Sequence, residues 1–172
     1  MVEELGASPD EPEEVVVRRV RMPDAADLRE HCFSMNTLEE VKVQTASNMD
    51  MQAAGQGFQL VAEVDGAVVG TLTLSCNDHP LNAHRAHLGS IVVSSHHQRR
   101  GIARRLIEES RRIAHTMGIE ILETSCRADT AAETAYAHVG FVEYGRLPKG
   151  IIEPWGDRHV FDQVYFYLPS DD

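Results

Sequence analysis

The stretch SIVVSSHHQRRGIARRLIEES (residues 90–110) places an apolar run, a polar loop, a glycine and an amphipathic pattern in direct succession. These features predict a strand over 86–95 that leads into a helix over 101–117. Four arginines crowd the start of that helix: Arg99, Arg100, Arg104 and Arg105. A helix N-terminus already carries about half a positive charge, so cations there are mildly unfavourable. In a chain of net charge −11, this cluster indicates that a negatively charged ligand binds at the turn.

Phosphate is the anion that fits this turn best. Unpaired backbone N–H groups at the beginning of a helix point toward one place and form an anion site. Gly101 has no Cβ, so an anion can approach the backbone closely there. Arg99, Arg100 and Arg104 can pair with phosphate oxygens. The sequence contains no GKS or GKT and no GxGxxG, which excludes a Walker loop and a dinucleotide fingerprint.

A solvated basic helix face is the alternative interpretation. It would place Arg104 opposite Glu108 and Arg105 opposite Glu109 as i,i+4 ion pairs. This alternative accounts well for Arg105 but poorly for the arginines of the loop. The basic cluster is small and local, so nucleic-acid binding is not expected.

Length and composition are typical of one globular domain in this chain of 172 residues. No apolar run approaches the length of about 18 residues that a membrane helix needs. Residues 1–14 carry six acidic side chains and no basic one, and they lack the apolar core of a signal peptide. We expect them to form a disordered acidic tail. The prediction is a cytoplasmic protein with no membrane partner, whose domain spans residues 15–170.

The cysteines and histidines do not form a metal-binding pattern. Cys32, Cys76 and Cys126 are far apart and odd in number, and no CxxC occurs, so we expect reduced thiols. His96 and His97 are adjacent, so their side chains point apart, and no carboxylate or cysteine lies near them in sequence. We therefore expect no metal.

Hydrophobic periodicity and turn signals predict a single α/β domain. The clearest hairpin spans 57–76, where Asp65-Gly66 is favoured chemistry for a two-residue turn. The other expected elements are a strand over 15–22, helices over 24–54 broken near Asn36-Thr37, a strand over 119–126, a helix over 129–140, and strands over 141–147 and 159–168 around an irregular segment, 148–158. The resulting order is β-αα-ββ-β-α-β-α-ββ.

Several of these segments resemble the GNAT superfamily of N-acetyltransferases. QRRGIA (98–103) resembles the Q/R-x-x-G-x-G/A signature for acetyl-CoA, and SIVV (90–93) resembles the fourth strand that precedes it. DTAAETAYAHVGF (129–141) resembles the later N-x-x-A-x-x-x-Y-x-x-x-G-F helix. The resemblance covers 15–168 and implies the GNAT fold, a central mixed, mostly antiparallel twisted sheet flanked by helices. The ending YGRLPKGIIEPWGDRHVFDQVYFYL (144–168) is also similar to the branch that contains the tabtoxin-resistance acetyltransferase.

This resemblance implies acetyl-CoA as the cosubstrate and assigns residues to it. The backbone of Ile91, Val92 and Val93 would bind the pantetheine arm, where the family's fourth and fifth strands splay apart. The loop and the first helical turn would hold the pyrophosphate, with the set Gln98, Arg99, Arg100, Gly101, Ile102, Ala103 and Arg104. Ala103 replaces the second glycine of the motif, a change that the motif allows.

Three positions depart from the family pattern. Ser95 stands where the family often has proline. Asp129, which the resemblance also assigns to the cofactor, stands where asparagine is usual; aspartate caps a helix equally well, but its charge could repel an anionic cofactor. Thr124 stands where some protein N-terminal acetyltransferases carry glutamate, which argues against a peptide amine as the acceptor.

Acetyl transfer to an amine needs a base that removes a proton and an acid that protonates the departing thiolate. Tyr136 matches the family tyrosine that reaches the cofactor sulfur, so the resemblance implies it as the acid; a tyrosine packed under the sheet is the alternative. His87 is our candidate base, because it has the same parity in its strand as Ile91 and Val93 and could face the cleft.

Other candidates for the base stay open. Asp78, His79 and Glu123 are rivals to His87, and a water chain with no dedicated base is a further alternative. Glu123 and Thr124 point to opposite faces of their strand, so only one of them reaches the cleft.

The segment PKGIIEPWGDR (148–158) contains the only tryptophan of the chain. Trp155, Glu153 and Asp157 could form a lid that holds an amine through cation–π and charge contacts. An ordinary hairpin loop with a buried anchor is the alternative.

The resemblance and the residues together predict an acetyl-CoA-dependent N-acetyltransferase that acts directly on a primary amine of a small molecule, in detoxification or antibiotic resistance. One alternative is a protein N-terminal or lysine acetyltransferase, and another is a non-catalytic acyl-CoA-binding sensor. Many relatives dimerise, and an apolar last strand is consistent with a homodimer.

Overall fold

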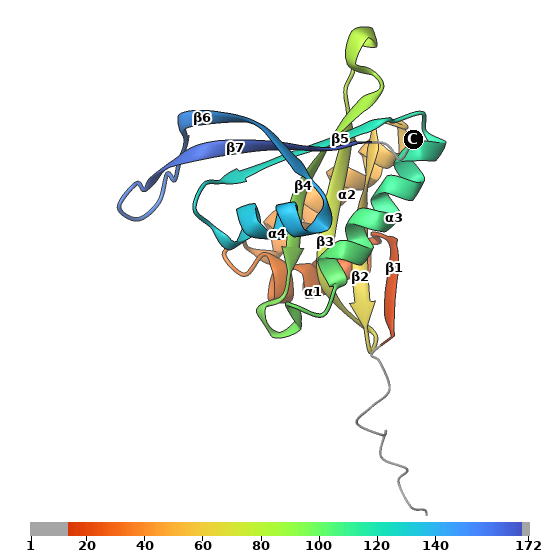
Figure 1. The fold of residues 1–172 in the computed structure, drawn as a ribbon. Helices are drawn as coiled ribbons and strands as arrows, with labels where there is room; N and C mark the ends of the chain where they lie inside the picture. The colour runs from red at the N-terminus through yellow and green to blue at the C-terminus, as the bar shows by residue number, and fades with distance from the viewer. Residues whose placement is uncertain (1–13, 170–172) are drawn as a thin grey trace, which may run out of the picture.

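Seven strands form one sheet, in the order β1-β2-β3-β4-β5-β7-β6, in a computed structural model that describes residues 14–169 (Figure 1). In chain order the strands are β1 (Val15–Arg19), β2 (Gly57–Val64), β3 (Ala67–Cys76), β4 (Arg85–Val93), β5 (Ile121–Arg127), β6 (Val142–Ile152) and β7 (Val160–Leu168). All neighbouring strands are antiparallel except β4 and β5, which are parallel. The predicted mixed, mostly antiparallel sheet is confirmed. All but the last residue of the predicted acidic tail lies outside the described residues.

Helical segments connect the strands in the predicted order. They are the short turns η1 (Met22–Asp24), α1 (Ala25–Asp27), η2 (Leu28–Cys32), η3 (Pro80–Asn82) and η4 (Ser95–His97), and the longer helices α2 (Leu38–Ala53), α3 (Ile102–Thr116) and α4 (Ala131–Val139). The predicted break before α2 is present because Thr37 caps that helix. The Thr37 hydroxyl accepts from Glu40 N at 3.2 Å, and the Glu40 carboxylate accepts from Thr37 N at 2.7 Å.

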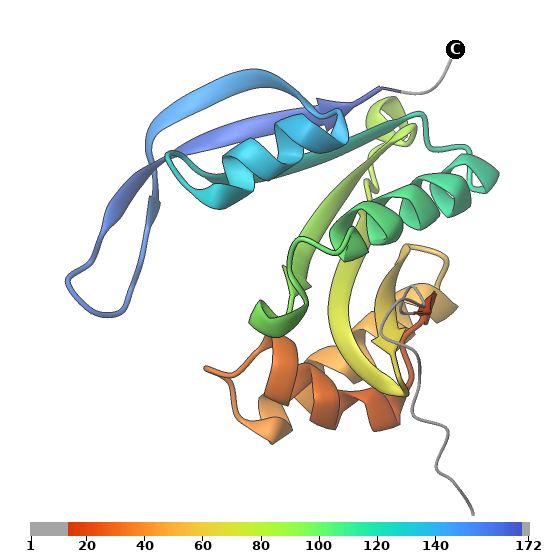
Figure 2. The same cartoon turned by 60° about the horizontal axis from the view of Figure 1, so that its bottom comes forward.

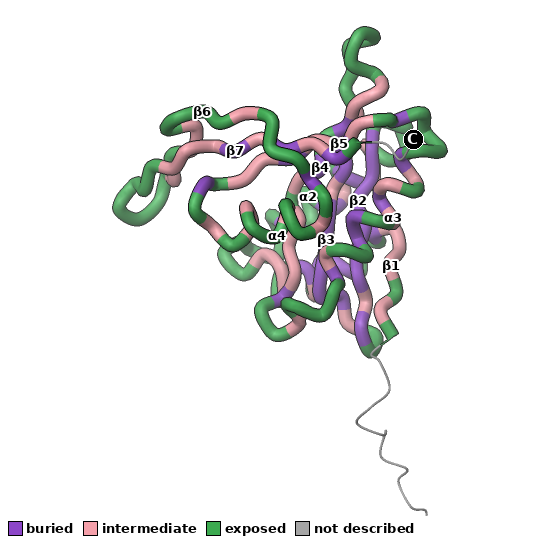
Figure 3. The backbone as a smooth tube through the Cα atoms, viewed as in Figure 1, coloured by how far each residue is buried: buried purple, intermediate pink, exposed green. Residues whose placement is uncertain are grey.

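Helices cover both faces of the N-terminal part of the sheet and create two cores (Figure 2). On one face, Ile102 and Leu106 of α3 pack in the larger core with Leu72 of β3. On the other face, Leu28 of η2 and Val41 of α2 belong to the smaller core. Burial is concentrated on the central strands β2 and β3, whereas much of the β6–β7 hairpin is exposed (Figure 3).

Two strand boundaries differ from the prediction. The segment from 148 was expected to be irregular, but β6 continues to Ile152. Its register shifts between Leu147 and Ile151, where Lys149 adopts a φ of 55° and its N–H donates to Asp162 Oδ1 at 2.9 Å. Proline and glycine here mark a bulge inside a strand, not the end of one. The strand expected to reach residue 95 ends at Val93.

A half-buried ion-pair network joins β1, η1 and β2. Arg18 donates to both oxygens of Asp24 at 2.8 Å and, through Nε, to Glu63 at 3.0 Å. Burial disfavours the charged carboxylate of Asp24, but its hydrogen bonds with Arg18 and with the backbone N–H of Arg21 outweigh that effect and hold its pKa below the usual value. This network fixes the first turn of the chain against the sheet.

We predict that Asp24→Asn lowers the free energy of unfolding by about 2–3 kcal/mol at pH 7, because it leaves Arg18 without its main counter-charge. The pKa of Asp24 is lowered in the folded state, so this stabilisation is present above the unfolded-state pKa of about 4 and is lost as the pH falls through the folded-state value. Urea denaturation across pH measures both effects. Asp50→Asn, at an exposed position of α2, is the control, and equal losses for the two variants would contradict the prediction.

Candidate functional site

The sheet opens between β4 and β5. These strands pair only where Arg85–His87 lie beside Ile121–Glu123. Beyond that point β4 continues along β3 and β5 continues along β7, so the two strands diverge (Figures 1 and 2). Among residues 14–169, no strand neighbours the edges that face each other there. An extended ligand can bind such an edge by strand-like hydrogen bonds. The predicted segment Ile91–Val93 lies on the β4 edge, where the strands have separated.

A β-bulge interrupts β4 at this opening. Thr71 lies beside Val92 and Thr73 lies beside Gly89, so β4 contains one more residue than β3 between the two pairs. Ser90, inside this interval, adopts a φ of 49°. The extra residue reverses which side chains of β4 point to which face.

The bulge changes which face of β4 carries His87 relative to Ile91 and Val93. Ile91 and Val93 pack against the larger core on the α3 face, whereas His87 lies on the opposite face beside Ser75 of β3. The expectation that His87 shares a face with Ile91 and Val93 is therefore wrong, because simple alternation does not hold across the bulge. His87 is nevertheless aimed along β4 toward the bulge, since its Nε2 lies 3.7 Å from the position that a Cβ on Gly89 would take.

The start of α3 has the geometry of an anion site. Gly101 forms the N-cap with a φ of 76°, and the preceding Arg99 also has a positive φ, of 62°. Open space surrounds the position of a Gly101 Cβ, so a ligand can approach the backbone. The structure brings the whole predicted segment, Gln98–Arg104, to this one turn after β4. Asp129, by contrast, lies before α4 and lines a separate hollow with Phe166.

The arginines of α3 have partners other than those of the basic-face alternative. Arg104 donates to the His138 carbonyl at the end of α4, and Arg105 donates to the Val15 carbonyl, each at 3.3 Å. Glu109 pairs with Arg112 at 2.7 Å. Arg104 therefore ties the first turn of α3 to α4, next to the candidate anion site.

Tyr136 approaches the opening from α4. Its ring packs against Phe141 and Phe166, with centroid distances of 5.5 and 5.7 Å. The Tyr136 side chain lies beside Thr124, whose hydroxyl donates to the Leu88 carbonyl at 2.9 Å. Burial raises the pKa of Tyr136 and outweighs the opposing influence of Thr124, so this phenol holds its proton at neutral pH.

His87 and Glu123 lie side by side on the opposite face. Burial lowers the pKa of His87, and the nearby charge of Glu123 only partly opposes this, so the imidazole is neutral at pH 7. Glu123 accepts two hydrogen bonds from Arg85, at 2.9 and 2.6 Å, and one from Tyr144 at 3.0 Å. Burial would raise the pKa of Glu123, but these bonds prevail and lower it. Of the two side chains, His87 is the better proton acceptor.

The remaining candidate bases lie farther from the opening. Asp78 and His79 are exposed in the connection before β4, at the end of that strand opposite the bulge. The Nδ1 atom of His79 accepts a hydrogen bond from Leu81 N at 3.2 Å.

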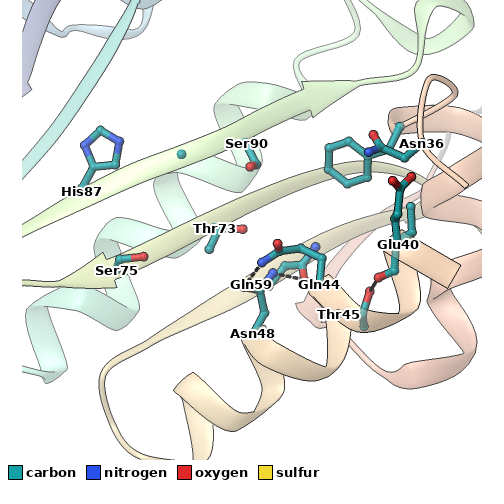
Figure 4. A pocket seen from close by; sticks show the side chains of 13 residues that line it. Asn36, Glu40, Gln44, Thr45, Asn48, Gln59, Thr73, Ser75, His87 and Ser90 are labelled. Atoms are coloured by element: carbon teal, nitrogen blue, oxygen red, sulfur yellow. Dashed lines mark hydrogen bonds between the residues drawn. The ribbon is translucent and has the colours of Figure 1, made fainter. Parts of the chain in front are cut away.

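A pocket of about 520 Å³ borders the bulge on the His87 face (Figure 4). His87, Gly89 and Ser90 form its β4 wall. The rest of the lining comes from β2, β3, α2 and the connection before α2, namely Phe33, Asn36, Glu40, Val41, Gln44, Thr45, Asn48, Gln59, Thr73 and Ser75. Sequence reasoning did not identify this pocket. The one local signal was that the apolar residues of α2 (LEEVKVQTASNMDMQA) do not gather on one face of the helix.

The predicted lid residues lie at the tip of the β6–β7 hairpin. Trp155 is 61% exposed, so the alternative of a buried anchor is wrong for this tryptophan. Glu153 pairs with Arg127 at 3.1 Å, and Asp157 is exposed. None of the three lines the pocket beside His87, and their role in substrate binding stays a prediction.

Residues 14–169 contain no cluster of three or more His, Cys, Asp or Glu side chains that could hold a metal ion. The three cysteines are free thiols, and burial raises the pKa of Cys32 to about 12. No helix in this part of the chain combines the length and the apolar character needed to cross a membrane.

Comparison with known proteins identifies the family. The Acetyltransferase (GNAT) domain family matches residues 22–149. The chain belongs to this family. Its members are acyltransferases, and acetyl-CoA is the cosubstrate that goes with this membership.

Individual relatives agree with this assignment. The chain is 36% identical over 98 residues to "Probable N-acetyltransferase family 8 member 5" of Mus musculus, a match that covers 55% of this chain and 43% of that protein. The match therefore spans less than half the length of this relative.

Solved GNAT structures share the fold. The ribosomal-protein-S5-alanine acetyltransferase from Vibrio fischeri superposes with a TM-score of 0.79 at 18% identity, and the match covers 94% of this chain and 96% of that chain. The yncA protein of Salmonella typhimurium, solved with its cofactor acetyl-CoA, superposes with a TM-score of 0.77 at 17% identity, covering 92% and 95%. At these identities the similarity concerns the fold alone.

Proposed function

We propose that this GNAT protein transfers an acetyl group from acetyl-CoA directly to a primary amine of a small molecule. The observation that carries the proposal is the opening between β4 and β5, which has an anion site at the start of α3 and a protonated phenol, Tyr136, beside it. Detoxification of an antibiotic or toxin would be a role for such an activity.

Two features of the structure support this use of acetyl-CoA. The unpaired edge of Ile91–Val93 suits the amide-bearing pantetheine arm. The amides of Gln98–Arg104 and the guanidinium groups of that segment suit the pyrophosphate. Asp129 lies before α4, and its role toward the cofactor stays a prediction.

We assign the proton transfers to groups on the two faces of the sheet. Acetyl-CoA supplies a thioester carbonyl, which only an unprotonated amine can attack. His87, neutral at pH 7, takes the proton that the amine nitrogen loses as its bond to carbon forms. Tyr136 gives its phenolic proton to the sulfur as the carbon–sulfur bond breaks. The products are an N-acetyl amine and CoA.

Two other functions are separated by the same assay. A protein N-terminal or lysine acetyltransferase would use peptides in preference to small amines, and Thr124 at the position discussed above argues against it. A non-catalytic sensor would bind acetyl-CoA without turnover. Release of CoA thiol from acetyl-CoA, measured with a panel of small amines and peptides, distinguishes the three. We retain the lid of Trp155, Glu153 and Asp157 and the homodimer as predictions.

Gly101→Ala should weaken acetyl-CoA binding about tenfold or more, because a Cβ would intrude where the anion meets the backbone. Gly118→Ala is the matched control. Gly118 follows the same helix with a φ of 77°, against 76° for Gly101, and both have open space at the Cβ position. Equal backbone strain is therefore expected, and calorimetric titration should show weaker binding only for Gly101→Ala. Equal affinities of the two variants would place the pyrophosphate elsewhere.

Tyr136→Phe should lower kcat about 100-fold, because it removes the acid and keeps the ring that packs against Phe141 and Phe166. Binding of acetyl-CoA should stay unchanged, which calorimetry checks alongside the rate of thiol release. A kcat within twofold of the parent protein would show that the thiolate leaves without this proton.

His87→Gln should lower kcat/KM about 100-fold at pH 7. A base works only when deprotonated, so the parent activity should fall as the pH drops through the pKa of His87, which lies below the ordinary value of about 6.5. The variant should lose this acid limb. Rates are compared per concentration of unprotonated amine, which removes the titration of the acceptor itself. A limb that persists in the variant would assign the base to another group.

A further inference from the structure

Helix α2 turns polar side chains toward the sheet. A helix that packs on a sheet usually buries an apolar stripe. The buried residues of α2 are instead Val41, Thr45 and Asn48, and the last two are only 1% and 8% exposed. Burying polar groups costs stability unless each finds a hydrogen-bond partner. Departures of this kind are expected where a surface is shaped for a ligand.

The buried polar groups form a chain of hydrogen bonds with a fixed direction. Thr71 Oγ1 lies 2.9 Å from the Leu60 carbonyl, which can only accept, so the Thr71 hydroxyl donates to it. Gln59 must then donate its amide N–H to Thr71, at 2.9 Å, and present its oxygen to the Asn48 amide N–H at 2.8 Å. Asn48 in turn accepts from Gln44 Nε2 at 3.1 Å.

This chain sets what the pocket offers to a ligand. The amide oxygen of Gln44 is left as an acceptor at the pocket lip, because its nitrogen is committed to Asn48. Asn48 and Gln59 each use one of two amide protons in the chain, so each keeps a second N–H. The pocket wall therefore contains one acceptor, the Gln44 oxygen, and two further N–H groups, those of Asn48 and Gln59.

Uncharged hydrogen-bonding groups dominate the lining. Four side-chain amides line the pocket, those of Asn36, Gln44, Asn48 and Gln59. Four hydroxyls accompany them, those of Thr45, Thr73, Ser75 and Ser90. The only carboxylate is Glu40, which already accepts two hydrogen bonds from Thr37 in the cap of α2. Phe33 adds an aromatic side chain.

Figure 4 shows how these groups are arranged. His87 stands at one end of the pocket, Glu40 and Asn36 stand at the other, and the amides of Gln44, Asn48 and Gln59 form the wall between them. A ligand whose amine lies near His87 thus extends along a wall in which amides and hydroxyls outnumber the apolar side chains of Phe33 and Val41.

We infer that the acceptor is a hydroxylated amine, an amino sugar or amino polyol, whose hydroxyls are bound by the amides of this pocket. This inference rests on the proposed function, in which His87 receives the proton of the amine. Each sugar hydroxyl both donates and accepts, so hydroxyls can pair with the Gln44 oxygen as well as with the N–H groups of Asn48 and Gln59. An aliphatic amine or diamine would leave the same amides unpaired, and a site built for hydroxyls discriminates strongly against analogues that lack them.

The test compares amines of matched shape. Glucosamine and cyclohexylamine each carry one primary amine on a six-membered ring, but only glucosamine has hydroxyls. The panel also includes 1,4-diaminobutane and a tripeptide with an N-terminal alanine. Thiol release from acetyl-CoA should show a kcat/KM for glucosamine at least tenfold above the others, per concentration of unprotonated amine. A preference for cyclohexylamine, the diamine or the peptide would overturn the inference.

Two glutamine-to-methionine variants test whether the preference for glucosamine arises in this pocket. Gln44→Met should raise the KM for glucosamine about fivefold and leave that for cyclohexylamine unchanged, because only the hydroxyls use its oxygen. Gln52→Met, at an exposed position of α2 outside the pocket, should change neither. A KM for glucosamine that is unaffected by Gln44→Met, or equally affected by Gln52→Met, would overturn the assignment.

Binding separates this inference from the proposed function. Glucosamine is titrated calorimetrically into the protein saturated with CoA, which requires no turnover. Glucosamine binding that exceeds cyclohexylamine binding and weakens in Gln44→Met would support the pocket even if no amine released CoA from acetyl-CoA, in which case the transferase proposal alone would fail. Glucosamine binding no tighter than that of cyclohexylamine would overturn the inference whether or not acetyl transfer occurs.

Discussion

The parallel pairing of β4 and β5 lasts for only three residues, and the site depends on this short contact. Beyond these three residues β5 stays paired with β7 and β4 stays paired with β3, so β4 and β5 separate from each other. A sheet that stayed closed would leave no edge for a ligand. The opening lies near the start of α3, which follows β4 after the short segment η4, and Tyr136 reaches the opening from α4.

The bulge at Ser90 distributes the chemistry between two faces. Ile91 and Val93 turn into the α3 core, which holds their backbone in place, while His87 turns into the polar pocket. Tyr136 reaches the opening from the α4 face, next to Thr124, so the proposed acid and base approach from opposite sides of the sheet. This separation prevents a phenol and an imidazole that both handle protons from pairing with each other.

The sequence predicted those element boundaries that depend on the conformational preferences of neighbouring residues. Glycines at the two ends of α3 and the Asp65-Gly66 turn identified element boundaries from conformational preference alone. The face of His87 could not be predicted, because counting residues along a strand misses a bulge. The pocket could not be predicted either, since Gln59 and Asn48 meet only after β2 and α2 have packed together.

In the binding mode proposed for acetyl-CoA, the two unpaired strand edges also make the stability of the folded chain depend on its cosubstrate. Edges of this kind are normally found at the margin of a sheet, where they invite unwanted pairing with other chains. Here they face each other inside the molecule, and a cosubstrate that fills the gap acts as an additional strand. A ligand present at 100 times its dissociation constant stabilises the native state by about 2.7 kcal/mol. Supply of the acetyl donor would thus set how long each copy resists unfolding and proteolysis.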